Sequence, residues 1–182
     1  MATIFMSFIH EEKLSASCVS FFIKNVLGHS IDTFMSSDET AIYAGEDWMT
    51  RILKELETAK VLISMLSPDS VKRPWINFEA GAAWMGKTIV IPVCFGGLTI
   101  AQLPKPYSSL QALEIETHEG AYYLASSIAH HLNVATPKKP IFRDVLPVGL
   151  GSRDPEENKS LFNHYKNLRT LLKLDRSNRA AD

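Results

Sequence analysis

Short, continuously apolar runs alternate along the chain with segments whose apolar residues recur every three or four positions. Runs that are apolar throughout indicate strands buried on both faces, and the helical spacing indicates amphipathic helices that cover them. This alternation is typical of an α/β fold with a parallel sheet. The predicted strands span 3–8, 30–36, 61–67, 88–95 and 112–115, and the predicted helices span 12–28, 46–60, 73–87 and 119–134.

The number and order of these elements predict a three-layer, flavodoxin-like fold. Right-handed crossovers would place helices on both faces of a five-stranded parallel sheet with strand order 2-1-3-4-5. In such sheets ligands bind beyond the carboxyl ends of the strands, where the strand order reverses. That point lies between the first and third strands, so the loops at 8–11, 36–47 and 67–75 are predicted to surround a site.

Some stretches fall outside this alternation. Residues 96–111 are predicted to form a long loop or a broken helix. Residues 135–159 are rich in proline, glycine and charge, which indicates a linker, whereas 154–177 have the spacing of an amphipathic helix. We therefore expect a domain at 1–135, followed at 136–182 by a linker and a C-terminal helical tail. That tail helix would dock on this domain, on a second copy, or on a further domain.

Composition and charge narrow the classes of function. The 182 residues are 46% hydrophobic and 21% charged with a formal net charge of -1, as in ordinary soluble domains. This charge gives no global attraction to nucleic acid or to anionic membranes. The longest apolar runs are too short to span a bilayer, and the N-terminal residues lack the basic region and cleavage site of a secretion signal. We therefore expect a cytoplasmic protein without membrane or nucleic-acid partners.

The two cysteines, Cys18 and Cys94, are expected to be free, buried thiols. Neither belongs to a C-x-x-C pair, and two cysteines cannot complete a zinc site without nearby histidines. No Gly-rich phosphate-binding motif and no serine in a nucleophile elbow occurs either. The sequence therefore predicts no metal site and no nucleophilic serine.

The predicted helix at 73–87 carries one carboxylate on an otherwise apolar and small surface. Glu79 follows Trp75 by four residues, so both side chains lie on one helical face. A lone acid in the first turns of a helix is most often a solvated residue that the helix dipole favours. This helix, however, directly follows the 67–75 loop at the expected ligand site, which makes Glu79 a candidate for chemistry.

Three segments, read in order, resemble the Toll/interleukin-1 receptor (TIR) domain family in its bacterial form. The first strand with its exit, IFMSFIHEEK, resembles the first box of that family. The segment FMSSDETAIYAGEDWMTRILKELETAKVLISMLS resembles the second box. The segment SPDSVKRPWINFEAG resembles the exit of the third strand with its W-x-x-x-E element. The resemblance covers about residues 3–134 and leaves the tail outside.

The resemblance implies an activity. Many bacterial and plant members of the family cleave NAD⁺ between nicotinamide and ribose, and the glutamate of the W-x-x-x-E element is catalytic. That glutamate maps to Glu79, NAD⁺ would be the substrate, and no cofactor would be needed. Family members often self-associate so that the 37–47 loop completes a neighbour's site. Bacterial members commonly serve antiviral defence or immune signalling, with a sensor or effector domain beyond the tail as a candidate partner.

Substrate binding is expected around Glu79, at Trp75, Ser7, Phe8, Ile9, Asp38, Ile42 and Trp48. Trp75 would form an aromatic wall beside the nicotinamide ring, or simply shape the pocket. Backbone groups at the end of the first strand would meet phosphate or ribose, although a plain hydrophobic strand end is the simpler interpretation. Asp38 is interpreted as a loop cap or a substrate contact, and Trp48 as a packing residue or a loop anchor.

A single carboxylate is enough for this reaction. Cleavage builds positive charge on the ribose while nicotinamide leaves as a neutral molecule, so no general acid is needed. O-glycosides, in contrast, usually require two carboxylates. At ~4 Å and an effective dielectric constant of ~20, one carboxylate offers ~4 kcal/mol to the developing cation, which is about three powers of ten in rate. Glu79 would act in this way or by orienting the ribose hydroxyls.

Two other functions also fit the sequence. One is a non-catalytic TIR interaction module that binds other TIR domains through the 37–47 loop. The other is an enzyme similar to nucleoside deoxyribosyltransferases, which share the sheet and use a catalytic glutamate on a nucleoside. The W-x-x-x-E element and the spacing of the second box favour an NAD⁺ glycohydrolase, with a linear or a cyclic ADP-ribose product.

Overall fold

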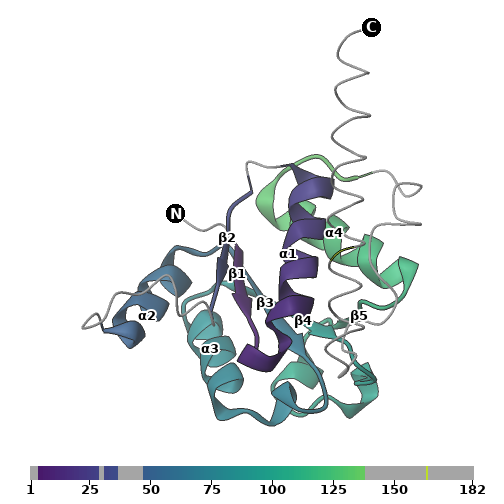
Figure 1. The fold of residues 1–182 in the computed structure, drawn as a ribbon. Helices are drawn as coiled ribbons and strands as arrows, with labels where there is room; N and C mark the ends of the chain where they lie inside the picture. The colour runs from purple at the N-terminus through teal and green to yellow at the C-terminus, as the bar shows by residue number, and fades with distance from the viewer. Residues whose placement is uncertain (1–3, 29–30, 37–46, 138–162, 164–182) are drawn as a thin grey trace, which may run out of the picture.

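Five parallel strands form the centre of the molecule. The computed structural model describes residues 4–28, 31–36, 47–137 and 163, and Figure 1 shows their arrangement. The strands are β1 (Ile4–Ser7), β2 (Thr33–Met35), β3 (Val61–Leu66), β4 (Ile89–Cys94) and β5 (Leu113–Glu114). Their order is β2-β1-β3-β4-β5 and every neighbouring pair is parallel, which confirms the predicted fold class.

Four α-helices of the described residues connect and cover the strands. They are α1 (Lys13–Leu27), α2 (Trp48–Thr58), α3 (Pro74–Met85) and α4 (His118–Leu132). Short 3-10 turns occur at η1 (His10–Glu12), η3 (Ser70–Lys72), η4 (Ile100–Gln102) and η5 (Tyr107–Ser109). The predicted loop or broken helix at 96–111 thus contains two single turns. Of the predicted linker and tail helix, only residues 135–137 and 163 are described, so that prediction and the domain boundary stay untested.

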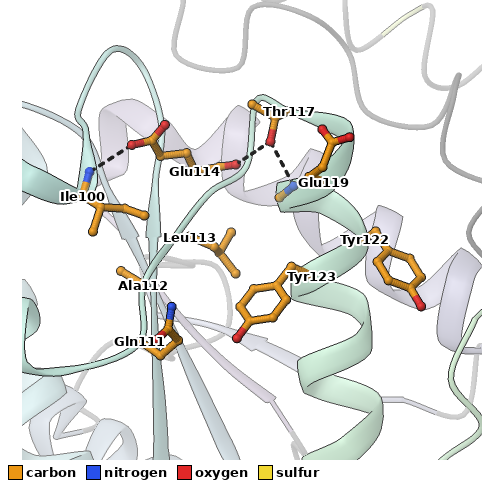
Figure 2. Close-up of a pocket in the computed structure, with 10 residues that line it drawn as sticks. Ile100, Gln111, Ala112, Leu113, Glu114, Thr117, Glu119, Tyr122 and Tyr123 are labelled. Carbon is orange, nitrogen blue, oxygen red and sulfur yellow. Dashed lines mark hydrogen bonds between the residues drawn. The ribbon is translucent and has the colours of Figure 1, made fainter.

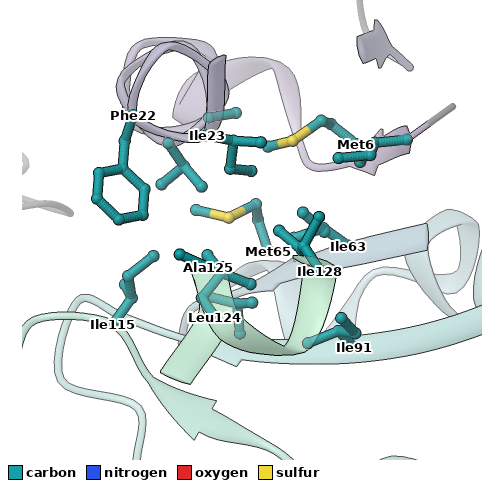
Figure 3. Close-up of a cluster of buried hydrophobic side chains, with 14 of the residues drawn as sticks. Met6, Phe22, Ile23, Ile63, Met65, Ile91, Ile115, Leu124, Ala125 and Ile128 are labelled. Atoms are coloured by element: carbon teal, nitrogen blue, oxygen red, sulfur yellow. The ribbon is translucent and has the colours of Figure 1, made fainter. Parts of the chain in front are cut away.

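Alternation along the strands divides the core between the two faces of the sheet. Ile4 and Met6 of β1 pack with residues of α1 and α4 in the larger cluster, part of which Figure 3 shows. Phe5 lies on the opposite face, in a cluster with residues of α2 and with Ala83 of α3. Because successive side chains of a strand point to opposite faces, Ser7 has the same orientation as Phe5 and faces α3.

The edge strands are shorter than the sequence predicts. β2 has three residues and β5 has two, against predicted ranges of 30–36 and 112–115. The central strands differ from their predicted ranges by at most one residue at either end. An edge strand pairs along one side only, and a short edge leaves few backbone groups unpaired.

Both cysteines are buried and unbridged, as expected. Within the described ranges, no helix combines the length and apolar character needed to cross a lipid bilayer. In the same part of the chain, His, Cys, Asp and Glu side chains do not gather in groups of three that could hold a metal ion.

Gly120 allows α4 to approach β5 closely. A Cβ atom at this position would lie 1.8 Å from the carbonyl oxygen of Glu114, so the backbone would have to move. We expect Gly120→Ala to lower the free energy of unfolding by about 3 kcal/mol, measured by urea denaturation. Gly81→Ala in the interior of α3 is the matched control, because a Cβ there meets nothing within 4 Å. The control should gain about 1 kcal/mol, and equal effects of both changes would contradict this account.

Candidate active site

Glu79 is buried and accepts a hydrogen bond from a residue of its own helix. Pro74 is the first residue of α3, where its missing N–H costs no helical hydrogen bond. Trp75 and Glu79 follow on one face, and the indole Nε1–H of Trp75 donates to Oε1 of Glu79 at 3.0 Å. Glu79 has no solvent-accessible surface. The acid is therefore neither solvated nor open to a ligand in this conformation.

The second carboxylate oxygen is bound by the sheet. Ser7 ends β1 and faces α3, and its Oγ donates to Oε2 of Glu79 at 2.5 Å. Ser7 is itself fully buried. The Ser7 hydroxyl is thus bonded to the acid, and the substrate contact expected of the backbone at this strand end stays a prediction.

Three buried serines lie in a row across neighbouring strands. Ser7 of β1 pairs with Ser64 of β3, and Ser36 lies one residue beyond the last paired residues of β1 and β2. All three are less than one-tenth exposed. The hydroxyl oxygens of Ser36 and Ser64 have no hydrogen-bond partner, whereas that of Ser7 is bonded to the acid.

Burial raises the pKa of Glu79 from the ordinary 4.5 to about 7. Hydrogen bonds from Ser7 and then from Trp75 act in the opposite direction, and Ser36 adds a smaller effect of the same sign. The Ser36 hydroxyl lies near the acid without a hydrogen bond of good geometry, so Ser7 and Trp75 are the direct donors to the carboxyl. Among the described residues, no basic side chain contributes to this pKa. The carboxyl is therefore balanced between its ionised and protonated forms near neutral pH.

Trp75 belongs to a stack of three aromatic rings. Its ring centroid lies 4.4 Å from that of Trp48 and 5.0 Å from that of Phe78. Trp48 is the first residue of α2, and the N-cap residue Asp47 accepts a backbone hydrogen bond of 3.1 Å from that helix. The stack joins the start of α2 to α3 and holds the indole that binds the acid.

A hollow of about 230 Å³ opens beside Trp75. We call it the Trp75 hollow. Each of the loops predicted to surround a site, at 8–11, 36–47 and 67–75, contributes to its lining. The lining residues are Phe8, Ile9, His10, Glu11, Ser36, Trp48, Arg73 and Trp75. The hollow thus lies beyond the carboxyl ends of β1 and β2, as sheets of this topology lead one to expect.

The turn η1 ties the mouth of the Trp75 hollow to the loop that precedes α3. Arg73 Nη2 lies 3.3 Å from Glu11 Oε1, and both side chains are more than half exposed. The next residue, Glu12, accepts a hydrogen bond from Ser67 Oγ. That hydroxyl also accepts hydrogen bonds from two backbone N–H groups of its own loop. Burial raises the pKa of Glu12 to about 7. These contacts fix the position at which α3 begins.

Comparison with known proteins identifies the fold family. The family model of the TIR domain matches residues 4–126. The chain belongs to the TIR domain family. No curated protein matches the chain.

Two solved structures are similar to this chain. A metazoan TIR-STING receptor from C. gigas, in complex with 2′,3′-cGAMP, is similar over 72% of this chain at 18% sequence identity, with a TM-score of 0.55. The match covers 39% of the receptor chain, so this TIR domain corresponds to less than half of that protein. The TIR domains of the activated Roq1 resistosome, which directly recognises the pathogen effector XopQ, match 60% of this chain and 68% of theirs, at 18% identity and a TM-score of 0.43.

The TIR fold brings most of the predicted site residues together. Those that line the hollow are Phe8, Ile9, Trp48 and Trp75. Glu79 and Ser7 lie behind the lining, bonded to each other. Asp38 and Ile42 lie outside the described residues, and their roles stay predictions.

Several residues at the hollow were not among the predicted site residues: Ser36, His10, Glu11 and Arg73. A signal for Ser36 was present, because the triplet Phe-Met-Ser occurs at both 5–7 and 34–36. Phe5 pairs with Phe34 and Met6 with Met35 across β1 and β2, which places the two serines at the ends of neighbouring strands. The charged residues at the mouth belong to no motif, and only the folded loops bring them together.

A larger hollow, of about 460 Å³, lies between β5 and the start of α4 (Figure 2). No predicted site residue lines it. Two of its polar groups already have structural partners, since Glu114 accepts a hydrogen bond from Ile100 N–H and Thr117 caps α4. We therefore place the candidate chemistry of the TIR domain at the smaller Trp75 hollow.

Glu79→Gln should stabilise the TIR domain at neutral and alkaline pH. Between pH 4.5 and about 7 the unfolded carboxyl ionises while the buried one stays protonated. The folded state then binds more protons, so the stability of the wild type falls as pH rises through this window. At about 1.36 kcal/mol per pH unit, the full effect is about 3 kcal/mol. Glutamine keeps an acceptor for the indole N–H and removes the charge.

This effect is measured as the free energy of unfolding of the variant minus that of the wild type, by urea denaturation at several pH values. We expect a difference near zero at about pH 4 that grows to about 3 kcal/mol above about pH 7. A difference that is the same at every pH would show that the carboxyl titrates as it does in the unfolded chain.

Proposed function

We propose that this TIR domain is an NAD⁺ glycohydrolase in which Glu79 stabilises the cationic ribose. The observation that carries the proposal is a buried carboxyl of raised pKa, without a cationic partner, directly behind the Trp75 hollow. A carboxyl in such surroundings is a frequent mark of a functional site. Membership of the TIR family adds support, because the W-x-x-x-E glutamate is the catalytic residue of its NAD⁺-cleaving members.

The reaction breaks the bond between C1′ of the ribose and the pyridinium nitrogen. The bonding electron pair leaves with nicotinamide, which becomes neutral, and positive charge develops at C1′. The ionised Glu79 offsets this charge in a site of low dielectric, where such an interaction is strongest. Water then attacks C1′ and loses a proton, which gives ADP-ribose. Attack by a hydroxyl group of the same molecule would give a cyclic product instead.

The dimensions of the hollow suggest how the substrate lies. Ligand pockets are commonly ~300–1,000 Å³, so a hollow of about 230 Å³ holds only part of a dinucleotide. The nicotinamide half would occupy it, with its ring against Trp75 and Trp48. The diphosphate would then lie at the mouth, where Arg73 is the cation of the described lining.

The enclosed state of Glu79 requires a movement before reaction. The Trp75 indole both lines the hollow and occupies one oxygen of the carboxylate. Withdrawal of the indole along its stack with Trp48 would expose that oxygen to C1′. The proposal therefore includes a closed form, which the structure describes, and an open form that is competent for reaction.

The wider role of the protein follows from the same proposal. We propose that copies of the chain associate through their TIR domains and that the 37–47 loop completes a neighbour's site. A cytoplasmic role in antiviral defence or immune signalling would suit an enzyme that consumes NAD⁺. These statements rest on the family, since no partner chain is present.

Incubation of the protein with NAD⁺ should release nicotinamide, which liquid chromatography detects together with the ADP-ribose product. Glu79→Gln should lower kcat/KM about 10³-fold, because it removes the charge that stabilises the cation. Glu12→Gln is the matched control, since Glu12 is also a carboxyl of raised pKa but does not line the hollow. The proposal fails if wild type releases no nicotinamide even at concentrations that drive self-association, and a non-catalytic interaction module would then be favoured.

The Trp75 indole should set the pH dependence of the reaction. Its N–H favours the ionised form of Glu79, so Trp75→Phe should raise the pKa of that carboxyl further. The acid limb of kcat/KM, near pH 7 in the wild type, should then move up by about one pH unit. Trp48→Phe keeps the stack and has no bond to the acid, so its limb should stay in place. Equal shifts in both variants would mean that packing, and not the hydrogen bond, controls the titration.

A further inference from the structure

Ser36 places an unused hydroxyl at the lining of the Trp75 hollow. The residue is 3% exposed, and its Oγ has no partner of good hydrogen-bond geometry among the residues that the structure describes. It nevertheless lies close enough to Glu79 to favour the ionised carboxylate. Ser36 lines the hollow and is buried because it lies one residue past the end of β2. Its backbone N–H donates a hydrogen bond of 3.0 Å to the carbonyl oxygen of Met6.

An unpartnered buried hydroxyl destabilises the folded protein, and such groups are rare enough to need an explanation. Packing does not require the oxygen, because alanine would fill nearly the same space. The hydroxyl of the neighbouring Ser7, in contrast, has a partner, because it donates a hydrogen bond to Glu79. A ligand bound in the hollow would supply the missing hydrogen-bond partner of the Ser36 hydroxyl.

We propose that the Ser36 hydroxyl binds the 2′-hydroxyl of the ribose whose glycosidic bond is broken. This inference rests on the proposed function for the identity of the sugar. To stabilise charge at C1′, Glu79 must lie within a few ångströms of that carbon. The 2′-hydroxyl is carried by the carbon bonded to C1′, so groups beside Glu79 meet it first. A serine can donate and accept, and it therefore binds a sugar hydroxyl that also donates to the carboxylate.

Ser64 provides a matched control within the same row. It is fully buried on the neighbouring strand β3, and its hydroxyl, which lies near that of Tyr107, has no partner of good hydrogen-bond geometry among the described residues. Unlike Ser36, it does not line the Trp75 hollow. Removal of either hydroxyl removes an unsatisfied polar group, so both alanine variants should be at least as stable as the wild type. A difference in activity between the two then reports on contact with substrate.

The test measures kcat/KM for Ser36→Ala and Ser64→Ala on NAD⁺ and on its analogue with 2′-deoxyribose on the nicotinamide side. We expect Ser36→Ala to lose about tenfold on NAD⁺ and nothing on the deoxy analogue, because the hydroxyl that it binds is absent there. Ser64→Ala should match the wild type on both substrates. Equal losses on both substrates, or equal losses in both variants, would overturn the assignment of Ser36.

A binding measurement separates this inference from the proposed function. Calorimetry with nicotinamide riboside and its 2′-deoxy form tests recognition without any cleavage. If the wild type prefers the hydroxylated ligand and Ser36→Ala loses that preference, the inference stands even where no nicotinamide is released from NAD⁺. A wild type that binds the two ligands equally would overturn it.

Discussion

The enclosure of Glu79 between α3 and β1 is the constraint on which the site depends. A buried carboxyl without a cation is unfavourable when ionised, and here two neutral donors, Trp75 and Ser7, are its direct partners. The two partners follow from two different periodicities. The helical repeat puts the indole one turn before the acid, and strand alternation turns the serine toward the helix. A shift of β1 by one residue would point Ser7 to the other face and leave the acid with one donor.

The aromatic stack extends this constraint to a third element. Trp75 cannot move without changing its contacts with Trp48 and Phe78, and Trp48 is the first residue of α2. The position of α2 and the accessibility of the acid are therefore coupled. A partner that displaced the start of α2 would act on Glu79 without touching it, because the indole links the two.

The sequence was sufficient for the architecture and for much of the site. Buried parallel strands are apolar throughout and their helices are amphipathic, so the elements and their order could be predicted from pattern alone. The W-x-x-x-E element marked Glu79 and Trp75, whose contact lies within one helix turn. Burial of the acid could not be predicted, because it depends on how closely α3 approaches β1. Arg73 and Glu11 lie 62 positions apart in the sequence, and only the fold brings them together at the mouth of the Trp75 hollow. No local sequence pattern could therefore have linked them.

A raised pKa and a need for negative charge are compatible if the substrate is the proposed one, because NAD⁺ carries a cationic pyridinium ring. In the closed form, desolvation holds the pKa of Glu79 at about 7, so a large share of the molecules carries a neutral acid that is less costly to bury. A pyridinium ring within a few ångströms favours the ionised form and lowers that pKa again. Binding of the substrate therefore supplies the charge state that the reaction needs. The acid would remain partly protonated in the empty site, where a buried negative charge destabilises the fold, and would ionise in the site that is about to react.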